Sequence, residues 1–419
     1  MAGNKDHRRM SQPIIFQSII APLLPLLKEE SCKLNGDRIY RLNLYVFTLN
    51  LCYCVIKGIG SISLLITEIK TSVDTKALDL VHASKSMYSE AFARYDPIIF
   101  KRIFLQLVKT LEFLPIPEMN ALGRFILIDG SIFPAIKTVE WAKYKTQANG
   151  LKLHLSYNLN KMIPTLFVVT DANTSEKKIL ASMLEPGITY IADRGYVAFK
   201  LFHQITKQCA FFIIRVKPNM HYSATDFLEV ELPEKWGNVL SNITDSLIVF
   251  DNDTNKGAYR LIGFTALGEV YWIATNRLDL KTHEIIMLYA YRWQIELFFR
   301  CLKRTLNGLH LWTHDQRGVE IQFYIYLIVY LLLISFKQNN TEKEQAIDEI
   351  DVIEKEGTAT CNQANAREQV SRTPACGMVT LLGEKLEQLW KMSIHWLTAV
   401  RNRLLEPMTP ENRELINSC

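Results

Sequence analysis

One short stretch of the chain has the residue types and the spacing of a functional site. In YAYRWQIELFFRCLKRTL, which begins at Tyr289, Arg292 lies three residues further on, Glu296 seven and Lys303 fourteen. At about 100° per residue of α-helix, these four side chains fall within an arc of roughly 60°. Glu296 is then a single acid among cations. Such a stripe fits either a solvated helix face or a site that handles an anion.

The same stretch carries a second face that is suited to packing. Arg300 falls beside the polar stripe, eleven residues after Tyr289. The apolar side chains collect elsewhere on the predicted helix, as expected of an element that covers a core. They are Ile295, Phe298, Phe299 and Leu302.

Two further acids stand where predicted strands end. Asp129 follows the apolar run FILI and precedes Gly130, and Asp193 follows TYIA and precedes Arg194. Each alone is more typical of a tight turn or a helix cap, because Asp next to Gly is ordinary turn chemistry. Together with Glu296 they make three carboxylates. Such a set can hold two divalent cations about 3.5–4 Å apart and catalyse phosphoryl transfer.

Helices and strands must position these residues, and the pattern of apolar and polar residues changes several times along the chain. Long apolar-periodic runs predict helices up to about residue 120. From 124 to 216 the predicted order is strand, strand, strand, helix, strand, helix, strand, followed by mainly β structure. The predicted units are an N-terminal helical domain that is a candidate for DNA binding (1–120), a first core segment (121–216), a β-rich insertion (217–280), a helix that ends the core (281–337), an acidic linker (338–375) and a C-terminal helix (376–419).

Composition narrows the class of protein. The chain has 419 residues, of which 48% are hydrophobic, and this is enough for a large core and for two to three domains. The formal net charge is +5, although residues 341–356 contain seven acids and two lysines. The rest of the chain is therefore more basic than the total, which fits a polyanionic partner.

Cysteine usage and hydropathy argue against other classes. The eight cysteines form no CxxC pair, which argues against a zinc site and a disulfide scaffold. The longest apolar run, 323–336, is shorter than the roughly 18 residues of a membrane span and is predicted to form a buried helix. We therefore expect a cytoplasmic protein.

The three motifs together resemble those of the DDE transposases of the bacterial insertion-sequence IS4 family. Asp129 lies in LIDGS, Asp193 lies in ADRGY, and the spaced Tyr, Arg, Glu and Lys residues have the family's gaps of two, three and six. The resemblance covers about residues 124–336. It implies an α+β or α/β fold, namely a ribonuclease H-like catalytic core with a mainly β insertion, flanked by an N-terminal helical domain and C-terminal helices.

That resemblance implies metal-dependent cut-and-paste transposition of an insertion sequence. Asp129, Asp193 and Glu296 would bind two Mg²⁺ ions, with Mn²⁺ as a substitute and no nucleotide cofactor. The reactions would be end nicking, hairpin formation and strand transfer. The partners would be double-stranded DNA, as terminal inverted repeats and target, and a second copy of the chain in a paired-end complex. The protein would act in the cytoplasm, at the nucleoid and away from membranes.

Further residues are candidates for contact with DNA. Tyr289, Arg292 and Lys303 would hold phosphate groups, with Arg300 beside them. The resemblance also implies an aromatic side chain that holds a flipped base, and Trp272 is the candidate. A tryptophan in the core is an equally good interpretation of Trp272.

The remaining candidates have similar alternatives. Trp293 is a rival for the base-stacking role, although we expect it to pack under the helix. Arg215 and Lys217 leave the strand FFIIRVK on one side by period two, and they fit either phosphate contact or an ordinary exposed pair. Arg194 directly follows Asp193 and fits either contact with the scissile phosphate or a simple ion pair.

Two other classes of function stay open. One is a metal-dependent nuclease that cuts without integrating. The other is a decayed copy that acts only as a DNA-binding regulator. All three carboxylates are present, so the sequence favours the transposase over the regulator.

Overall fold

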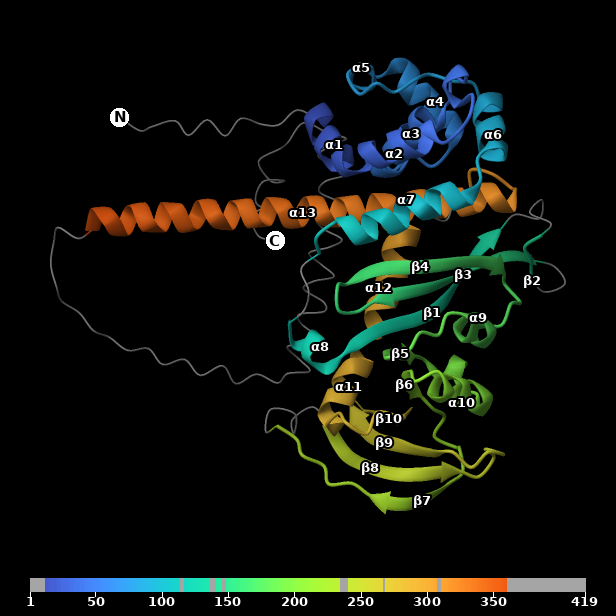
Figure 1. The fold of residues 1–419 in the computed structure, drawn as a ribbon, viewed down its shortest axis with the longest axis vertical. Coiled ribbons are helices and arrows are strands. Elements are labelled where there is room, and N and C mark those ends of the chain that lie inside the picture. The colour runs from blue at the N-terminus through green and yellow to red at the C-terminus, as the bar shows by residue number, and fades with distance from the viewer. Residues whose placement is uncertain are drawn as a thin grey trace.

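The N-terminal part of the chain is a set of helices that lies above a large sheet (Figure 1). The structure is a computed structural model, and it describes residues 12–113, 117–135, 141–144, 148–233, 240–266, 268–306 and 310–359. Polar caps begin several of the helices, because side-chain oxygens satisfy the free N–H groups of the first turn. The helices are α1 (Gln12–Ile20), α2 (Leu24–Cys32), α3 (Leu44–Ile56), α4 (Ile62–Thr71), α5 (Val73–Lys76), α6 (Lys85–Arg94) and α7 (Pro97–Thr110), with short 3₁₀ turns η1 (Ala21–Leu23) and η2 (Asp37–Ile39).

The sheet is mixed and holds ten strands among the described residues. Its order is β2-β3-β1-β5-β6-β10-β9-β8-β7, with β4 paired to β3. The pairs β1 with β5 and β5 with β6 are parallel, whereas the other pairs are antiparallel. The strands are β1 (Arg124–Ala135), β2 (Lys143–Tyr144), β3 (Ala148–Asn158), β4 (Ile163–Asp171), β5 (Ile188–Ala192), β6 (Phe211–Arg215), β7 (Tyr222–Phe227), β8 (Leu240–Phe250), β9 (Ala258–Ala266) and β10 (Glu269–Thr275).

Helices cover the two faces of the sheet with different cores. One core joins one sheet face to α11 (Thr282–Ala290), α12 (Trp293–Arg300), α13 (Gln316–Ala359) and the N-terminal helices. The other core joins the opposite face to α9 (Glu176–Ser182) and α10 (Phe199–Lys207). The shorter elements are α8 (Pro117–Leu122), the 3₁₀ turn η3 (Arg194–Tyr196) and a π-helical turn (Cys301–Thr305).

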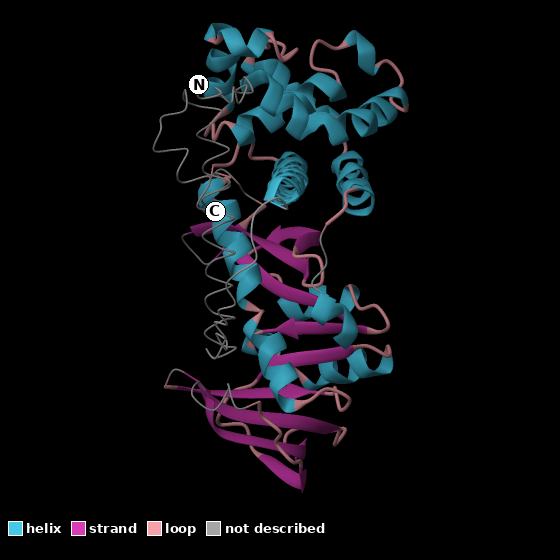
Figure 2. Ribbon diagram, turned by 90° about the vertical axis from the view of Figure 1, so that its left-hand side faces the viewer, coloured by secondary structure: helices cyan, strands magenta, loops and turns pink. Residues whose placement is uncertain are grey.

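The structure confirms the predicted order of elements from 124 to 216 and adds the short β2 and the 3₁₀ turn η3. The mainly β segment that follows is also confirmed, since β7 to β10 form a continuous antiparallel ladder. Figure 2 shows the separation of the helical part from the strand-rich part. The whole is a mixed α+β arrangement with a large mixed sheet, which is compatible with the predicted ribonuclease H-like core.

Helix α13 corrects the predicted start of the acidic linker. It begins at Gln316 and continues to Ala359, so the first part of the segment 338–375 is helical. The physical reason is that the charges of TEKEQAIDEIDVIEKE stand on residues with high helix propensity and without proline or glycine. The rest of the predicted linker and the predicted C-terminal helix (376–419) lie outside the described residues.

The first half of α13 runs between the N-terminal helices and the sheet (Figure 1). Residues Gln316–Asn339 are long and apolar enough to cross a membrane, by length and composition alone. However, 83% of their most apolar window is buried inside the protein. The prediction of a buried helix over 323–336 is confirmed.

The stretch from Tyr289 to Lys303 is not one regular helix, contrary to the prediction from its spacing. Helix α11 ends at Ala290, and bonds of the i to i−3 type tighten the chain before α12 begins at Trp293. A π turn then follows, in which Leu306 N–H bonds to the carbonyl of Cys301. The tight turn overwinds the chain and the π turn underwinds it, so neither follows the predicted 100° step. The predicted packing face is nevertheless buried, as Ile295, Phe298, Phe299 and Leu302 are each at most 5% exposed.

Candidate active site

The register of two parallel strands brings Asp129 and Asp193 to neighbouring positions. The last paired residues of β1 and β5 are Leu127 and Ile191, and each acid lies two residues beyond its partner in that pair. Side chains alternate along a strand, so each acid faces the same side as the residue two before it. Leu127 and Ile191 both belong to the core under α12. Asp129 and Asp193 therefore point toward α12.

Helix α12 brings the third predicted acid to this side of the sheet. Arg292 Nη1 lies 2.7 Å from Glu296 Oε1, an i,i+4 ion pair whose side chains are 14% and 32% exposed. The Tyr289 hydroxyl donates a hydrogen bond of 3.4 Å to Asp193 Oδ1. The pKa of the Tyr289 phenol is raised to about 12, chiefly by burial, with Arg292 opposing and Asp193 adding to the shift. The hydroxyl is therefore a hydrogen-bond donor at neutral pH.

Lys303 closes the same site from the π turn. Its ammonium donates a 2.9 Å hydrogen bond to the Ile132 carbonyl on β1 and lies 4.8 Å from the centre of the Phe133 ring. Burial lowers the pKa of Lys303, and the negative charge of Asp129 opposes that change. Lys303 is thus anchored to the strand that carries Asp129.

The surroundings of Asp129 disfavour the charged form of its carboxyl. Burial raises the pKa of its carboxyl to about 6, against the opposing effects of the Gly130 N–H and Arg292. The charges of Glu176 and Glu296 raise it further. A buried carboxyl beside two other carboxylates has too little positive charge around it.

The donor chemistry fits a divalent cation, because three carboxylates offer hard oxygen ligands. The raised pKa of Asp129 supports this fit, since a cation would relieve the repulsion. The described ranges contain no group of three His, Cys, Asp or Glu residues close enough together to hold an ion. Instead, Arg292 supplies the local positive charge, and its Nε atom is buried without a hydrogen-bond partner among those residues. The three acids therefore lie on one side of the sheet, but Glu296 is paired with Arg292 and does not form a close group with the other two.

The other predicted DNA contacts are more scattered. Arg194 is exposed on η3 and Arg300 is exposed at the end of α12. Lys217 is exposed beyond the end of β6. Arg215 is half-buried, and its guanidinium lies 4.4 Å from the centre of the Tyr271 ring.

The two tryptophans have different surroundings, and Trp272 agrees with its interpretation as a core residue. Trp272 packs on the α10 side of the sheet, where its ring fills the space beside Gly263. A Cβ on Gly263 would lie 2.6 Å from Trp272 Cζ3. Trp293, expected to pack under the helix, is 45% exposed. That expectation is wrong, because the tight turn at the start of α12 rotates the side chain away from the core.

Two residues near the site escaped the sequence reasoning. Tyr271 precedes Trp272 and by period two faces the opposite side of β10, where it stacks on Phe264 at 5.2 Å between ring centres. Arg215 and Arg292 both act on its pKa, which places it near the site. The alternation of β10 could have revealed Tyr271. Glu176 carries no signal in the sequence, because only the tertiary structure brings it near Asp129.

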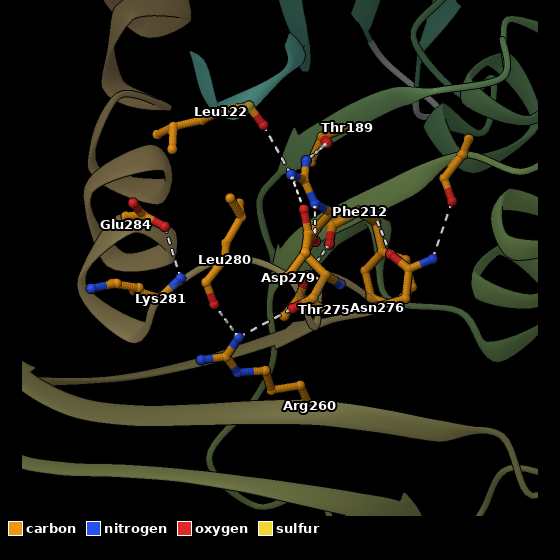
Figure 3. Close-up of polar contacts among 12 residues, drawn as sticks. Leu122, Thr189, Phe212, Arg260, Thr275, Asn276, Asp279, Leu280, Lys281 and Glu284 are labelled. Carbon is orange, nitrogen blue, oxygen red and sulfur yellow. Dashed lines mark hydrogen bonds and ion pairs between the residues drawn. The ribbon is translucent and has the colours of Figure 1, made fainter. Parts of the chain in front are cut away.

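A buried polar network fixes α11, and through it α12, to the sheet, and Figure 3 shows the part of it in which Arg260 contacts Leu280. Arg260 on β9 pairs with Asp245 on β8 at 2.6 Å, and the Thr282 hydroxyl at the start of α11 donates to the same carboxylate at 2.7 Å. Arg260 also donates to the Leu280 carbonyl. The β-rich segment therefore holds the first turn of α11, the helix that precedes α12 and Glu296.

Arg277 joins the same region to the strands of the acids (Figure 3). Its guanidinium donates to Thr189 Oγ1 on β5 at 2.6 Å, to the Leu122 carbonyl before β1 at 2.9 Å, and to both oxygens of Asp279 at 2.7 Å. Planar guanidinium groups suit such multiple recognition. One side chain thus links the segment before α11 to the base of β1 and β5.

Asp129 on β1 and Asp193 just after β5 lie on the side of the sheet that α12 and Glu296 cover, and carboxylates are the donors that enzymes of metal-dependent phosphoryl transfer use. Residues 120–332, half of the chain, match the family described as the transposase DDE domain. The chain therefore belongs to that family and is a DNA transposase, an enzyme that acts on DNA. The family depends on divalent metal ions in general.

Relatives agree with this assignment. The chain is 30% identical over 250 residues to the Sinorhizobium fredii protein named as transposase y4zB, covering 58% of this chain and 69% of that protein. It is 25% identical over 193 residues to the protein named as the transposase for insertion sequence element IS5377 of Geobacillus stearothermophilus, covering 46% and 51%. It is 24% identical over 256 residues to the protein named as the transposase for insertion sequence element IS4SA of a Synechocystis strain, covering 59% and 70%.

Proposed function

We propose that this protein is an IS4-type transposase with a ribonuclease H-like core that moves its own insertion sequence by a cut-and-paste route. The observation that carries the proposal is the equivalent placement of Asp129 and Asp193, each two residues beyond the last β1–β5 pair, on the side of the sheet that α12 and its Arg292–Glu296 pair cover. The proposed reactions are nicking at the element's ends, hairpin formation, and strand transfer to target DNA.

Asp129, Asp193 and Glu296 are the proposed ligands of two Mg²⁺ ions, which Mn²⁺ can replace. Such ions supply activation of a water or a 3′-hydroxyl and neutralise the leaving oxygen. The Tyr289 hydroxyl orients Asp193 through their hydrogen bond, and Lys303 orients β1 next to Asp129. Glu296 becomes free to ligate when Arg292 finds another anion.

The proposed anion is the phosphate backbone of the DNA. Arg292 is the first choice for that contact because its guanidinium already lies among the acids, and a planar fork suits phosphate. Lys303 is the second choice, and Arg300, Arg194, Arg215 and Lys217 are proposed to hold flanking phosphates. Of these, Arg215 lies close enough to Tyr289 for its charge to lower the pKa of that phenol.

A flipped base at the hairpin step requires an aromatic face. Trp272 is the candidate from the sequence, but its ring packs beside Gly263 on the far side of the sheet. Trp293 directly follows Arg292, and its exposed ring is accessible to a base. We therefore propose Trp293 ahead of Trp272 for the stacking role.

The proposed assembly is a homodimer that holds two terminal inverted repeats, with the proposed domain units 1–120, 121–216, 217–280 and 281–337 in each subunit. The site of action is the cytoplasm, at the nucleoid. Light scattering of the protein on end duplexes, under conditions that support cleavage, would measure the mass of the complex. A mass of one protein per DNA end would contradict the proposed homodimer.

The test of the function is a cleavage assay on labelled duplexes that carry the sequences flanking the gene. We expect Mg²⁺- or Mn²⁺-dependent cuts at discrete positions and a hairpin product from the wild type. Glu296→Ala should bind the duplex and fail to cut it, with a loss of several orders of magnitude. Exposed Glu185→Gln, in the turn before β5, is the matched control.

Other outcomes identify the competing functions. Metal-independent cutting, or equal cutting by Glu296→Ala, would reject the three-carboxylate site. Cutting without hairpins or strand transfer would favour a nuclease. Binding without cutting by the wild type would favour a decayed copy that acts as a regulator.

A further inference from the structure

A fourth carboxylate reaches the proposed active site from the opposite side of the sheet. Glu176 is the first residue of α9, which packs on the face away from α12. A Cβ added to Gly130 would lie 2.8 Å from Glu176 Oε1 and 3.2 Å from its Cδ. A Cβ added to Gly195 would lie 3.5 Å from Glu176 Oε2. One carboxylate therefore lies against the glycines that follow Asp129 and Asp193.

A lysine from a third element holds this carboxylate. Lys152 Nζ on β3 lies 3.2 Å from Glu176 Oε1, and the two side chains are 13% and 25% exposed. The same ammonium donates to the Thr174 carbonyl at 3.4 Å, just before α9. A pair with this much burial is screened less by water than a surface pair. Glu176 is thus tied to β3 while its oxygens face β1 and η3.

The position matters because the strand ladder ends before the acids. The β1–β5 pairing stops at Leu127 and Ile191, two residues short of Asp129 and Asp193. Backbone hydrogen bonds between these two strands therefore do not set the spacing of the acids themselves. The Glu176 carboxylate lies beside Gly130 and Gly195, in the region just beyond the end of that pairing.

The neighbouring phenol supports this location. Tyr196 follows Gly195, is 1% exposed, and its hydroxyl has no hydrogen-bond partner among the described residues. Burial raises the pKa of the Tyr196 phenol, and the charges of Glu176 and Asp129 raise it further. The phenol therefore lies within electrostatic range of both carboxylates.

We propose that Glu176 is a positioning residue of the transposase: its carboxylate, anchored by Lys152, spaces the backbone segments that carry Asp129 and Asp193. This inference rests on the proposed roles of those two acids. It also explains the glycine after Asp129, because a side chain at Gly130 would push the carboxylate away, whereas one at Gly195 would only contact it.

The first test compares Glu176→Ala with Glu176→Gln in the full-length protein. Residues that support metal ligands typically change metal affinity or activity by about 10- to 100-fold. We expect Glu176→Ala to weaken Mn²⁺ binding by such a factor, measured by calorimetry or by electron paramagnetic resonance, and cleavage should recover at high Mn²⁺. Glu176→Gln should stay close to the wild type, because the amide keeps the size and can still accept from Lys152.

The outcomes are distinguishable. Wild-type Mn²⁺ affinity in a folded Glu176→Ala would overturn the proposal. A Glu176→Gln variant as inactive as Asp129→Asn would also overturn it, in favour of a direct role in the chemistry. Glu185→Gln controls for the loss of a negative charge. Glu296→Ala is measured beside these variants. If it still cuts DNA, the proposed roles of the three acids are contradicted, and this outcome is distinct from a failure of the role proposed for Glu176.

The second test is a double-mutant cycle with Gly130→Ala. The new methyl group should displace the Glu176 carboxylate, so Gly130→Ala should lower Mn²⁺ affinity as Glu176→Ala does. In the Glu176→Ala background the same methyl group has room, and Gly130→Ala should add little further loss. Losses that multiply in the double variant would overturn the proposal, because the two residues would then act independently.

Discussion

At the scale of single residues, Asp129 is the most informative side chain. Its carboxyl is raised to a pKa of about 6 by burial and by the neighbouring acids, against an unfolded value near 4. The ionised form is therefore disfavoured in the folded protein. The cost is absent below about pH 4, grows between pH 4 and 6, and is complete above pH 6. The carboxyl that we propose as a metal ligand is therefore unfavourable for stability.

The first prediction concerns Asp129→Asn without metal. The amide carries no charge, so the variant should be more stable than the wild type above pH 6, by an order of 1–3 kcal/mol. Thermal unfolding of metal-free protein at pH 7.5 measures the difference, which should shrink as the pH falls toward 4. The variant should also fail to cut DNA. Equal stability at both pH values would contradict the assigned cause of the shift.

The second prediction concerns the two tryptophans. Loss of base stacking costs about 1–3 kcal/mol, which corresponds to roughly 5- to 150-fold. We expect Trp293→Ala to slow hairpin formation by such a factor and to leave first-strand nicking nearly unchanged. Trp272→Ala should instead lower thermal stability, because its ring packs in the sheet. A specific hairpin defect in Trp272→Ala alone would restore the assignment made from the sequence.

At the scale of elements, the position of α12 depends on contacts that lie far from the chemistry. The Arg260–Asp245 pair is 5% and 0% exposed and binds Thr282 at the start of α11. Arg277 joins the preceding segment to β5 and to the start of β1. The tight turn and the π turn that flank α12 then set the directions of Arg292 and Lys303. The 100° step of a regular α-helix therefore does not predict the directions of these two side chains.

The third prediction concerns Asp245→Asn. The change leaves the Arg260 charge buried without its counter-ion, which typically costs about 3–5 kcal/mol. The midpoint of urea unfolding, followed by circular dichroism, should fall accordingly, and cleavage at 37 °C should decline with it. Glu231→Gln is the matched control, because Glu231 forms an exposed ion pair with Lys281 and such pairs contribute little. Equal effects of the two changes would contradict the structural role of the buried pair.

At the scale of the whole molecule, the binding of DNA and of metal should be coupled. Arg292 is paired with Glu296, so the proposed ligand Glu296 is a poor one until the guanidinium moves. A DNA phosphate that attracts Arg292 would release Glu296. By linkage, the metal must then strengthen DNA binding by the same factor.

The fourth prediction follows from this coupling. End duplex should raise the Mn²⁺ affinity of the protein within the usual range of about 5- to 150-fold. Calorimetric titration with and without DNA measures the change, and Arg292→Met should remove most of it. Identical Mn²⁺ affinity with and without duplex would show that the Arg292–Glu296 pair does not control access to the metal.

Much of the chain's organisation follows from local pattern. Strand alternation and apolar periodicity predict β1, β3 to β6, α9 and α10 in their order, because side-chain period reflects which face is buried. The spaced Tyr, Arg, Glu and Lys residues and the motifs LIDGS and ADRGY predict a DDE transposase, and the match of residues 120–332 to the transposase DDE domain supports that class. Helix propensity within the acidic segment could also have predicted the length of α13, but its high charge favoured a linker.

The sequence by itself therefore determined the order of the elements, the family and the identities of the candidate acids, since these depend on residue type and spacing. Only the tertiary structure decided the placement of Asp129 and Asp193 just beyond the paired ends of β1 and β5, the exposure of Trp293, and the approach of Glu176 to two glycines. The physical reason is that these features depend on strand pairing and on contacts between residues far apart in the chain. Local periodicity carries no information about such contacts.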